Sequence, residues 1–190
     1  MNKIVGLSLA LMMVIGMIGV ETFAYFTDTE TSSGNQQLTG TLDLSTNNTD
    51  GVSQTLYTTN MSPGATLGPS TITLKNTGTT DGATLDIGFS YVKSDGIPNS
   101  VNKTANEVAA LIEVITLNYG GTSLLSSISD NNTNGYKDVY DLKNSSLTGL
   151  SGIAVLATNN FDISVRLRSE TGNDFQADGI TITMTFTLKQ

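Results

Sequence analysis

Carboxylate and amide side chains recur at regular spacing in the stretch DNNTNGYKDVYD, from Asp130 to Asp141. The order D-x-N-x-N-G-x-x-D-x-x-D matches a calcium-binding loop of the EF-hand type, in which oxygens from alternate positions of a short loop converge on the ion. Gly135 occupies the position of the sharp turn. The spacing predicts calcium as the one cofactor, held by side chains of Asp130, Asn132, Asn134, Asp138 and Asp141 and by the backbone carbonyl of Tyr136.

Two positions depart from the usual calcium loop. Asp141 stands where a bidentate Glu normally closes the site, and Lys137 stands where an apolar residue normally packs. With three carboxylates the expected affinity lies in the millimolar range of extracellular modules. The alternative interpretation is an Asn- and Gly-rich surface turn that binds no ion. The sequence leaves both open.

The chain contains no His and no Cys. Ser-His-Asp and Cys-His catalysis and HExxH zinc sites are therefore excluded, and no disulfide can form. The scattered Asp and Glu residues show no pairing of the kind that glycoside hydrolysis needs. The sequence thus predicts a protein that is not an enzyme. Its net charge of −8 argues against nucleic acid as a partner.

Asn-x-Ser/Thr sequons provide candidate glycosylation sites. They begin at Asn47, Asn60, Asn102, Asn131 and Asn144. A glycan on Asn131 would conflict with calcium in the same loop.

The N-terminus has the pattern of a secretion signal. Lys3 supplies a positive charge, residues 4–20 form an apolar run, and small residues precede a cleavage site between Ala24 and Tyr25. We expect signal peptidase to cut there during export, leaving no stable membrane anchor. The expected location is extracellular, on the cell surface or in a biofilm matrix.

Most of the remaining chain alternates apolar and polar residues with period two, which is typical of antiparallel strands with one buried face. The inward series are Leu38, Leu42 and Leu44; Ile72 and Leu74; Leu85, Ile87, Phe89 and Tyr91; Phe161, Ile163, Val165 and Leu167; and Ile180, Ile182, Met184, Phe186 and Leu188. These strands predict a mainly β fold, a jelly-roll-like antiparallel β-sandwich.

One or two short helices interrupt this pattern. A capping-box spacing at Thr104 and Glu107 predicts a helix over 105–113 that runs into a strand over 115–119. A second short helix is expected within 137–150. The predicted organisation is a signal peptide over 1–24, an N-terminal segment over 25–37 and one β-sandwich domain over 38–190.

Four motifs, in order, resemble the TasA/camelysin family of secreted biofilm fibre proteins. They are ETFAYFTDTETSSGN around the cleavage site, GTLDL at 40–44, SPG at 62–64 leading to KNTG at 75–78, and GNDFQAD at 172–178. The resemblance covers essentially the whole precursor. It implies a jelly-roll subunit of biofilm filaments, related to archaeal bundling pili, that assembles head to tail with copies of itself.

In such filaments the N-terminal strand of one subunit completes the sheet of the next. The resemblance implies this donor-strand role for Tyr25, Phe26, Thr27, Asp28, Thr29, Glu30 and Thr31. Their threonines favour strand conformation, yet the segment is too polar for a core strand of its own domain. The alternative function is a monomeric secreted adhesin or carbohydrate-binding protein, although the chain has no Trp for sugar stacking.

Overall fold

A computed structural model describes residues 41–47, 49–50, 53–58, 61–95, 102–172, 175 and 177–190. The predicted signal peptide and donor segment lie outside these residues. The elements are β1 (Leu44–Thr46), β2 (Thr49–Asp50), β3 (Ser53–Tyr57), β4 (Thr66–Asn76), β5 (Thr84–Lys93), α2 (Ala105–Ala109), β6 (Ile112–Tyr119), β7 (Thr122–Ser123), η1 (Leu125–Ser127), α3 (Val139–Asn144), β8 (Leu147–Ser151), β9 (Thr158–Leu167) and β10 (Ile180–Lys189).

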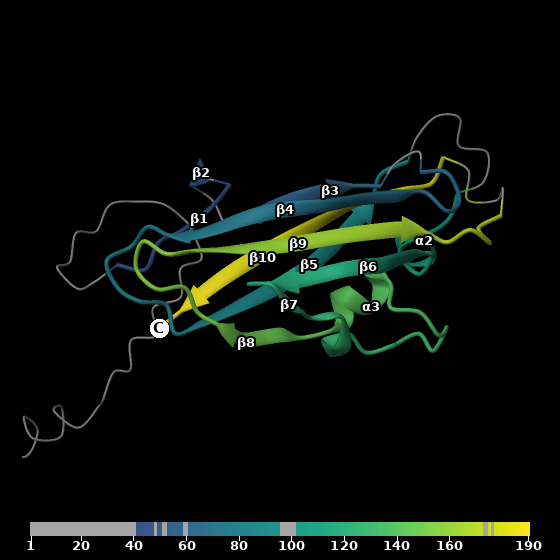
Figure 1. The fold of residues 1–190 in the computed structure, drawn as a ribbon. Helices are drawn as coiled ribbons and strands as arrows, with labels where there is room; N and C mark the ends of the chain where they lie inside the picture. The colour runs from purple at the N-terminus through teal and green to yellow at the C-terminus, as the bar shows by residue number, and fades with distance from the viewer. Residues whose placement is uncertain are drawn as a thin grey trace, which may run out of the picture.

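The strands form two antiparallel sheets packed face to face, which confirms the predicted β-sandwich (Figure 1). One sheet has the order β2-β1-β4-β9-β6-β7, and the other has the order β3-β10-β5-β8. From β3 to β6 the chain alternates between the sheets, and it does so again from β8 to β10. Alternation of this kind gives the jelly-roll-like connectivity, because sequential strands then face each other across the core.

The core lies between the sheets and contains most of the predicted inward series; Leu42, Phe89 and Leu167 are only partly buried, and Leu38 lies outside the described residues. Phe161 on β9 packs edge-on against Phe186 on β10, with ring centroids 5.4 Å apart, and its centroid lies 6.2 Å from that of Phe89 on β5. All five inward residues of β10 are buried. Burial of one such side chain stabilises the fold by about 1.5–3 kcal/mol, so this strand is a main source of stability.

The helix predicted over 105–113 is shorter than expected. The capping box forms as predicted, since Thr104 Oγ1 accepts from the Glu107 backbone N–H and the Glu107 carboxylate accepts from the Thr104 N–H. However, α2 ends at Ala109, and β6 begins at Ile112 rather than at 115. Pairing of Ile112 with Leu167 on β9 prevails over the helical spacing of the same apolar residues.

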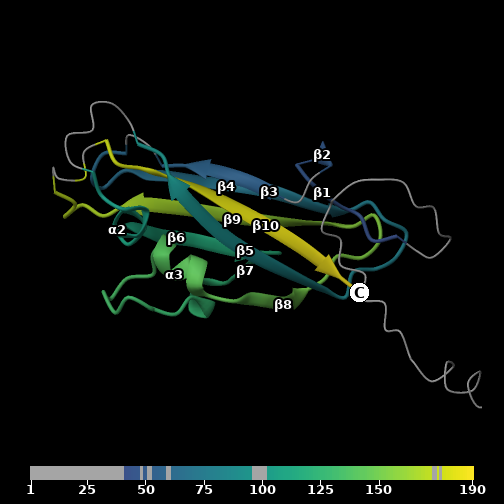
Figure 2. The ribbon, with the colours of Figure 1, turned by 180° about the vertical axis from the view of Figure 1, so that it is seen from behind.

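The second predicted helix, α3, lies against both β5 and β6. β7 is the edge strand of one sheet and β8 is the edge strand of the other. The helix covers the side of the sandwich where these two edges lie, as the view from behind shows (Figure 2). The side chain of Asp138 caps its N-terminus.

The KNTG motif builds one end of the sandwich. Asn76 is fully buried; its Nδ2 donates to the carbonyls of Thr80 and Ile153, at 2.8 and 2.9 Å, and its Oδ1 accepts from Gly78 N. A Cβ on Gly78 would lie 2.2 Å from the Thr41 carbonyl oxygen. Only glycine fits there, because the segment entering β1 crosses directly over it.

The GTLDL motif at 40–44, which supplies Leu42 and Leu44 of the predicted inward series, is strand only at its end. Among the described residues, Thr41–Asp43 pair with no strand, and β1 begins at Leu44. The segment instead binds the KNTG turn: Thr77 N donates to Asp43 O and Thr79 N to Thr41 O, both at 2.7 Å. Loop backbone, not a sheet ladder, satisfies these carbonyls.

Candidate functional site

The predicted calcium loop connects η1 to α3. Its last two predicted ligands are helix-capping residues. Asp138 Oδ1 accepts from the backbone N–H of Asp141 at 3.0 Å, and Asp141 Oδ2 accepts from that of Asp138 at 3.4 Å. Both carboxylates are completely buried. This reciprocal capping box fixes where α3 starts.

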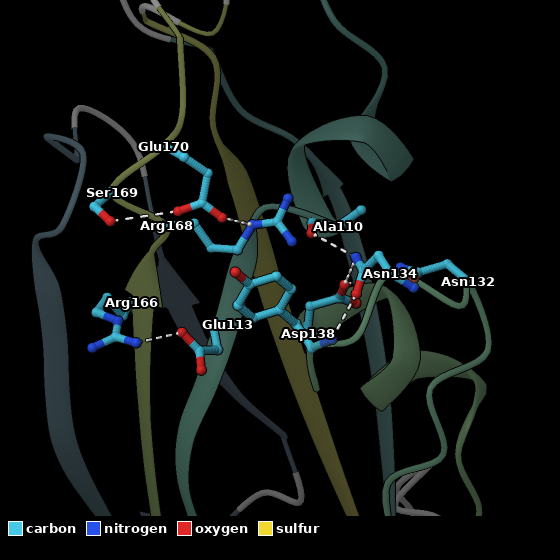
Figure 3. A network of polar contacts seen from close by, with 10 residues as sticks. Ala110, Glu113, Asn132, Asn134, Asp138, Arg166, Arg168, Ser169 and Glu170 are labelled. Atoms are coloured by element: carbon cyan, nitrogen blue, oxygen red, sulfur yellow. Dashed lines mark hydrogen bonds and ion pairs between the residues drawn. The ribbon is translucent and has the colours of Figure 1, made fainter.

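Side-chain amides close the loop over Asp138 (Figure 3). The Nδ2 groups of Asn132 and Asn134 donate to Asp138 Oδ2 at 2.9 and 2.8 Å. Asn134 Nδ2 also donates to the carbonyl of Ala110, at the end of α2, at 3.3 Å. The amides therefore join the loop, the start of α3 and the end of α2 into one polar network.

Backbone N–H groups bind the other two carboxylates of the loop. Asp130 accepts from Asn134 N at 3.1 Å and from Gly135 N at 2.9 Å, and Asp141 Oδ1 accepts from Asn131 N at 2.7 Å. Gly135 has φ +84°, the left-handed conformation that the sharp turn requires. The predicted turn at Gly135 is therefore present.

Burial raises the pKa of Asp138 above its ordinary value. Hydrogen bonds from Asn132, from the Asp141 backbone and from Asn134 act in the opposite direction, and the nearby Asp141 carboxylate raises the pKa further. The largest effect is removal from water, which disfavours the charged form of an acid.

The far side of the loop is attached to the end of β9. The Arg168 guanidinium lies 4.3 Å from the ring centroid of Tyr136, and its Nε lies 3.2 Å from Glu170 Oε1. Lys137 Nζ donates to the carbonyl of Ile128. Lys137 is half-buried and thus lies along the loop.

Five of the six predicted calcium ligands lie in the loop, and Asp141 lies in the first turn of α3. Protein donors already bind all three carboxylates. Among the described residues, no group of three or more acidic side chains is arranged to hold a metal ion. Calcium binding stays a prediction.

The model of the camelysin metallo-endopeptidase family matches residues 1–190. The chain belongs to this family. At this level, membership supports a secreted or surface protein related to biofilms, as the four motifs indicated. No curated protein matches the chain. In the part of the chain that the structure describes, no helix is long and apolar enough to cross a membrane.

Among the described residues of this camelysin-family chain, the donor atoms do not fit the catalytic metal that the family description implies. The sequence has no His or Cys, and the described residues lack a cluster of three acidic ligands. Asp138 and Asp141, the two buried carboxylates of the loop, are occupied in helix capping. The described part of the chain therefore offers no ligand set for a peptidase metal.

Four of the five candidate glycosylation sites lie among the described residues, and their asparagines are exposed: Asn47, Asn102, Asn131 and Asn144. Asn60 lies outside them, as do the cleavage residues Ala24 and Tyr25 and the donor residues. Asn47 has φ +51°, and its Oδ1 accepts from Thr73 N at 2.9 Å, so it terminates the pairing of β1 with β4. Glycosylation stays a prediction.

The segment Thr41–Asp43 is a structural feature that the sequence patterns missed. Besides the backbone bonds that it accepts from Thr77, Thr79 and Thr80, its Thr41 N donates to Thr79 Oγ1 at 2.9 Å. These contacts hold Thr41, the first described residue, against the KNTG turn at one end of the sandwich. In the sequence, only the repeated Thr residues of KNTGTT pointed to this contact, and they did not indicate which segment they bind.

Proposed function

We propose that this protein is a structural subunit of an extracellular filament, assembled by donor-strand complementation after signal cleavage. The observation that carries the proposal is the anchored segment Thr41–Asp43 at one end of a β-sandwich, beyond which lies the segment that the family resemblance implies as a donor. The proposed role is non-enzymatic.

A donor strand binds mainly through its backbone. Each added ladder hydrogen bond contributes about 0.5–1.5 kcal/mol net, so a ten-residue strand gains several kcal/mol before ordering costs. Full burial of Tyr25 and Phe26 adds about 1.5–3 kcal/mol apiece. These gains oppose the entropy lost when the donor is ordered and the subunits associate.

Head-to-tail insertion is a heterologous contact, which does not close on itself and therefore generates a filament. Before cleavage, the signal peptide holds the donor segment in the membrane. Cleavage at Ala24 frees Tyr25, so polymerisation is confined to the outside of the cell.

The decisive experiment compares three purified proteins by electron microscopy. They are the mature chain from Tyr25, a truncation that lacks 25–34, and a length-matched variant in which 25–31 are replaced by Gly and Ser. We expect filaments from the first protein alone. Ordered filaments from the truncation would refute the proposal, and filaments from the Gly/Ser variant would show that length rather than strand formation matters.

Monodisperse globules from the mature chain at every concentration would instead favour a monomeric adhesin or carbohydrate-binding protein. Circular dichroism of all three proteins serves as the folding control, because the described sandwich begins after the deleted residues.

A further inference from the structure

Strand β4 is paired along one side but only partly along the other. Its neighbour β9 pairs with it from Thr66 to Lys75. On the opposite side, the three residues of β1 pair only with Leu74, Lys75 and Asn76. Asn47 then turns the chain, and β2 pairs with the far side of β1. Among the described strands, none pairs with this side of β4 from Thr66 to Thr71.

The half of β4 that β1 does not reach is more exposed to solvent than the half that β1 covers. Ile72 and Leu74 are buried, whereas Thr66 and Thr71 are exposed and Leu67, which packs against the core, is only partly buried. We call Thr66–Thr71 the open half of β4, because no described strand pairs with this side of it and the apolar side chain of Leu67 beneath it is only partly buried.

Backbone alternation identifies the groups available at this edge. Thr73 bonds Asn47 on the β1 side, since its carbonyl accepts from Asn47 N and its N–H donates to Asn47 Oδ1. Thr71, two residues earlier, presents its N–H and C=O to the same side. The Ala65 carbonyl accepts from Leu167 N on the β9 side, so Thr66 also faces the open edge. Pro69 has no N–H and interrupts the ladder between them.

The open half of β4 and the exit of the N-terminal segment lie at opposite ends of the sandwich. Thr41 is bound beside Gly78, just past the C-terminal end of β4, whereas Thr66 begins that strand. The C-terminus lies at the same end as the exit (Figure 1). In two copies stacked end to end, Thr41 of one copy would therefore lie next to the Thr66 end of β4 in the other copy.

We infer that the edge Thr66–Thr71 of β4 receives residues 25–31 of the neighbouring copy, in antiparallel orientation. This inference rests on the proposed function and assigns its acceptor. Because the donor leaves its own subunit beside the neighbour's Thr66 end, Thr31 lies near Thr66 and Thr27 near Thr71. The donor then continues the line of the neighbour's β1, which is also antiparallel to β4.

The length of the chain is sufficient for this contact. Residues 32–40 span up to about 30 Å when extended, at roughly 3.3 Å per residue. The 11 residues of β4 span about 36 Å. The linker therefore reaches the near half of the next copy. Pairing of the donor with β4 of its own chain would most directly give the reverse, parallel orientation, because the segment would return from the Asn76 end.

Cysteine pairs test the inference, since the chain has no Cys of its own. Each double variant carries one donor cysteine and one acceptor cysteine. Thr71→Cys is combined separately with Thr27→Cys and with Asp28→Cys, which lie on opposite faces of the donor strand. Thr66→Cys is combined separately with Glu30→Cys and with Thr31→Cys. After assembly and mild oxidation, we expect one of each pair to give a ladder of covalent oligomers in denaturing gels. Disulfides need Cα separations of about 4.4–6.8 Å, so cross-linking reports direct pairing.

The control pairs the same donor cysteines with Thr148→Cys, an exposed position on the edge strand β8. Filaments that cross-link at Thr148, or that give no covalent ladder at Thr66 and Thr71, overturn the assigned edge and leave the proposed function intact. Covalent monomer alone identifies self-pairing, and absence of filaments from the cysteine-free mature chain overturns the proposed function itself. Electron microscopy and circular dichroism before oxidation confirm assembly and folding of each variant.

Discussion

Asp138 is the residue on which the polar network depends. It is completely buried, caps α3, and receives both amide side chains of the loop. Replacing it by Ala leaves these donors without an acceptor, which costs about 1–3 kcal/mol of unfolding free energy. The matched control is Asp130→Ala in the same loop, which is exposed, so water can replace its bonds and the expected loss is about 1 kcal/mol or less. Urea denaturation of both variants measures the difference; equal losses would contradict the central role of Asp138.

Calcium binding by the same loop is testable on the purified monomer. Titration calorimetry is expected to give binding with millimolar affinity, abolished in Asp130→Ala, because three carboxylates without a terminal Glu bind weakly. Calcium should also raise the thermal midpoint of the wild type alone, since a ligand that binds only the native state stabilises it. If no heat appears at millimolar calcium, the loop is a turn closed by its own hydrogen bonds.

The ionisation of Asp86 on β5 makes the folding stability of the sandwich depend on pH. Partial burial raises its pKa, but the hydrogen bonds from Lys189 and from Gly149 N, together with the Lys189 charge, lower it below the ordinary 3.8. A carboxyl group with a lowered native pKa contributes stability above its unfolded pKa, and this contribution is lost as pH falls through the native value. Wild type should therefore lose more stability than Asp86→Asn below about pH 4. Parallel denaturant curves at pH 7 and pH 3 would show this, and identical losses would remove Asp86 from the explanation.

At the scale of elements, the loops at the KNTG end are held by close backbone contact. A Cβ on Gly152 would lie 1.9 Å from the Gly82 carbonyl oxygen, so the two loops must separate in Gly152→Ala. We expect a loss of about 1–3 kcal/mol or more, as in other overpacked sites. Gly88→Ala is the control, because its Cβ would meet only Thr185 O at 3.9 Å. Thermal unfolding should separate the two variants clearly; a destabilised Gly88→Ala would indicate a general intolerance of alanine instead.

The long strands could be predicted from sequence because alternation is a local property. The Thr residues of β10 alternate with five apolar residues, and every one of those five is buried. The extents of α2 and β1 could not be predicted in the same way. Apolar residues near 112 satisfy helical spacing as well as strand spacing, and pairing with β9 decides between them. The short β1 depends on the turn at Asn47 and on the KNTG loop, both set by contacts distant in sequence.

At the candidate site, the sequence pattern predicted the turn but not the contacts of the carboxylates. The spacing placed a sharp turn at Gly135, which has the left-handed conformation, and the calcium role of the six predicted ligands stays a prediction. It could not show that Asp138 and Asp141 cap a helix, or that the Asn amides turn their nitrogens toward Asp138. Those arrangements follow from the position of α3 against β5 and β6, which only the complete fold provides.

At the scale of the whole molecule, head-to-tail assembly makes a filament with two different ends. A copy that lacks residues 25–34 retains the open half of β4, so it accepts a donor strand but provides none. Added to full-length copies, it should stop growth at one end, and one truncated copy in ten should limit filaments to about ten subunits on average. Length distributions from electron microscopy measure this effect. A truncated copy cross-linked at Thr66–Thr71 to a peptide of residues 25–34 is the matched control, since its acceptor is filled and it should leave filament length unchanged. Unaltered lengths with the free truncated copy would mean that growth does not pass through a donated N-terminal strand.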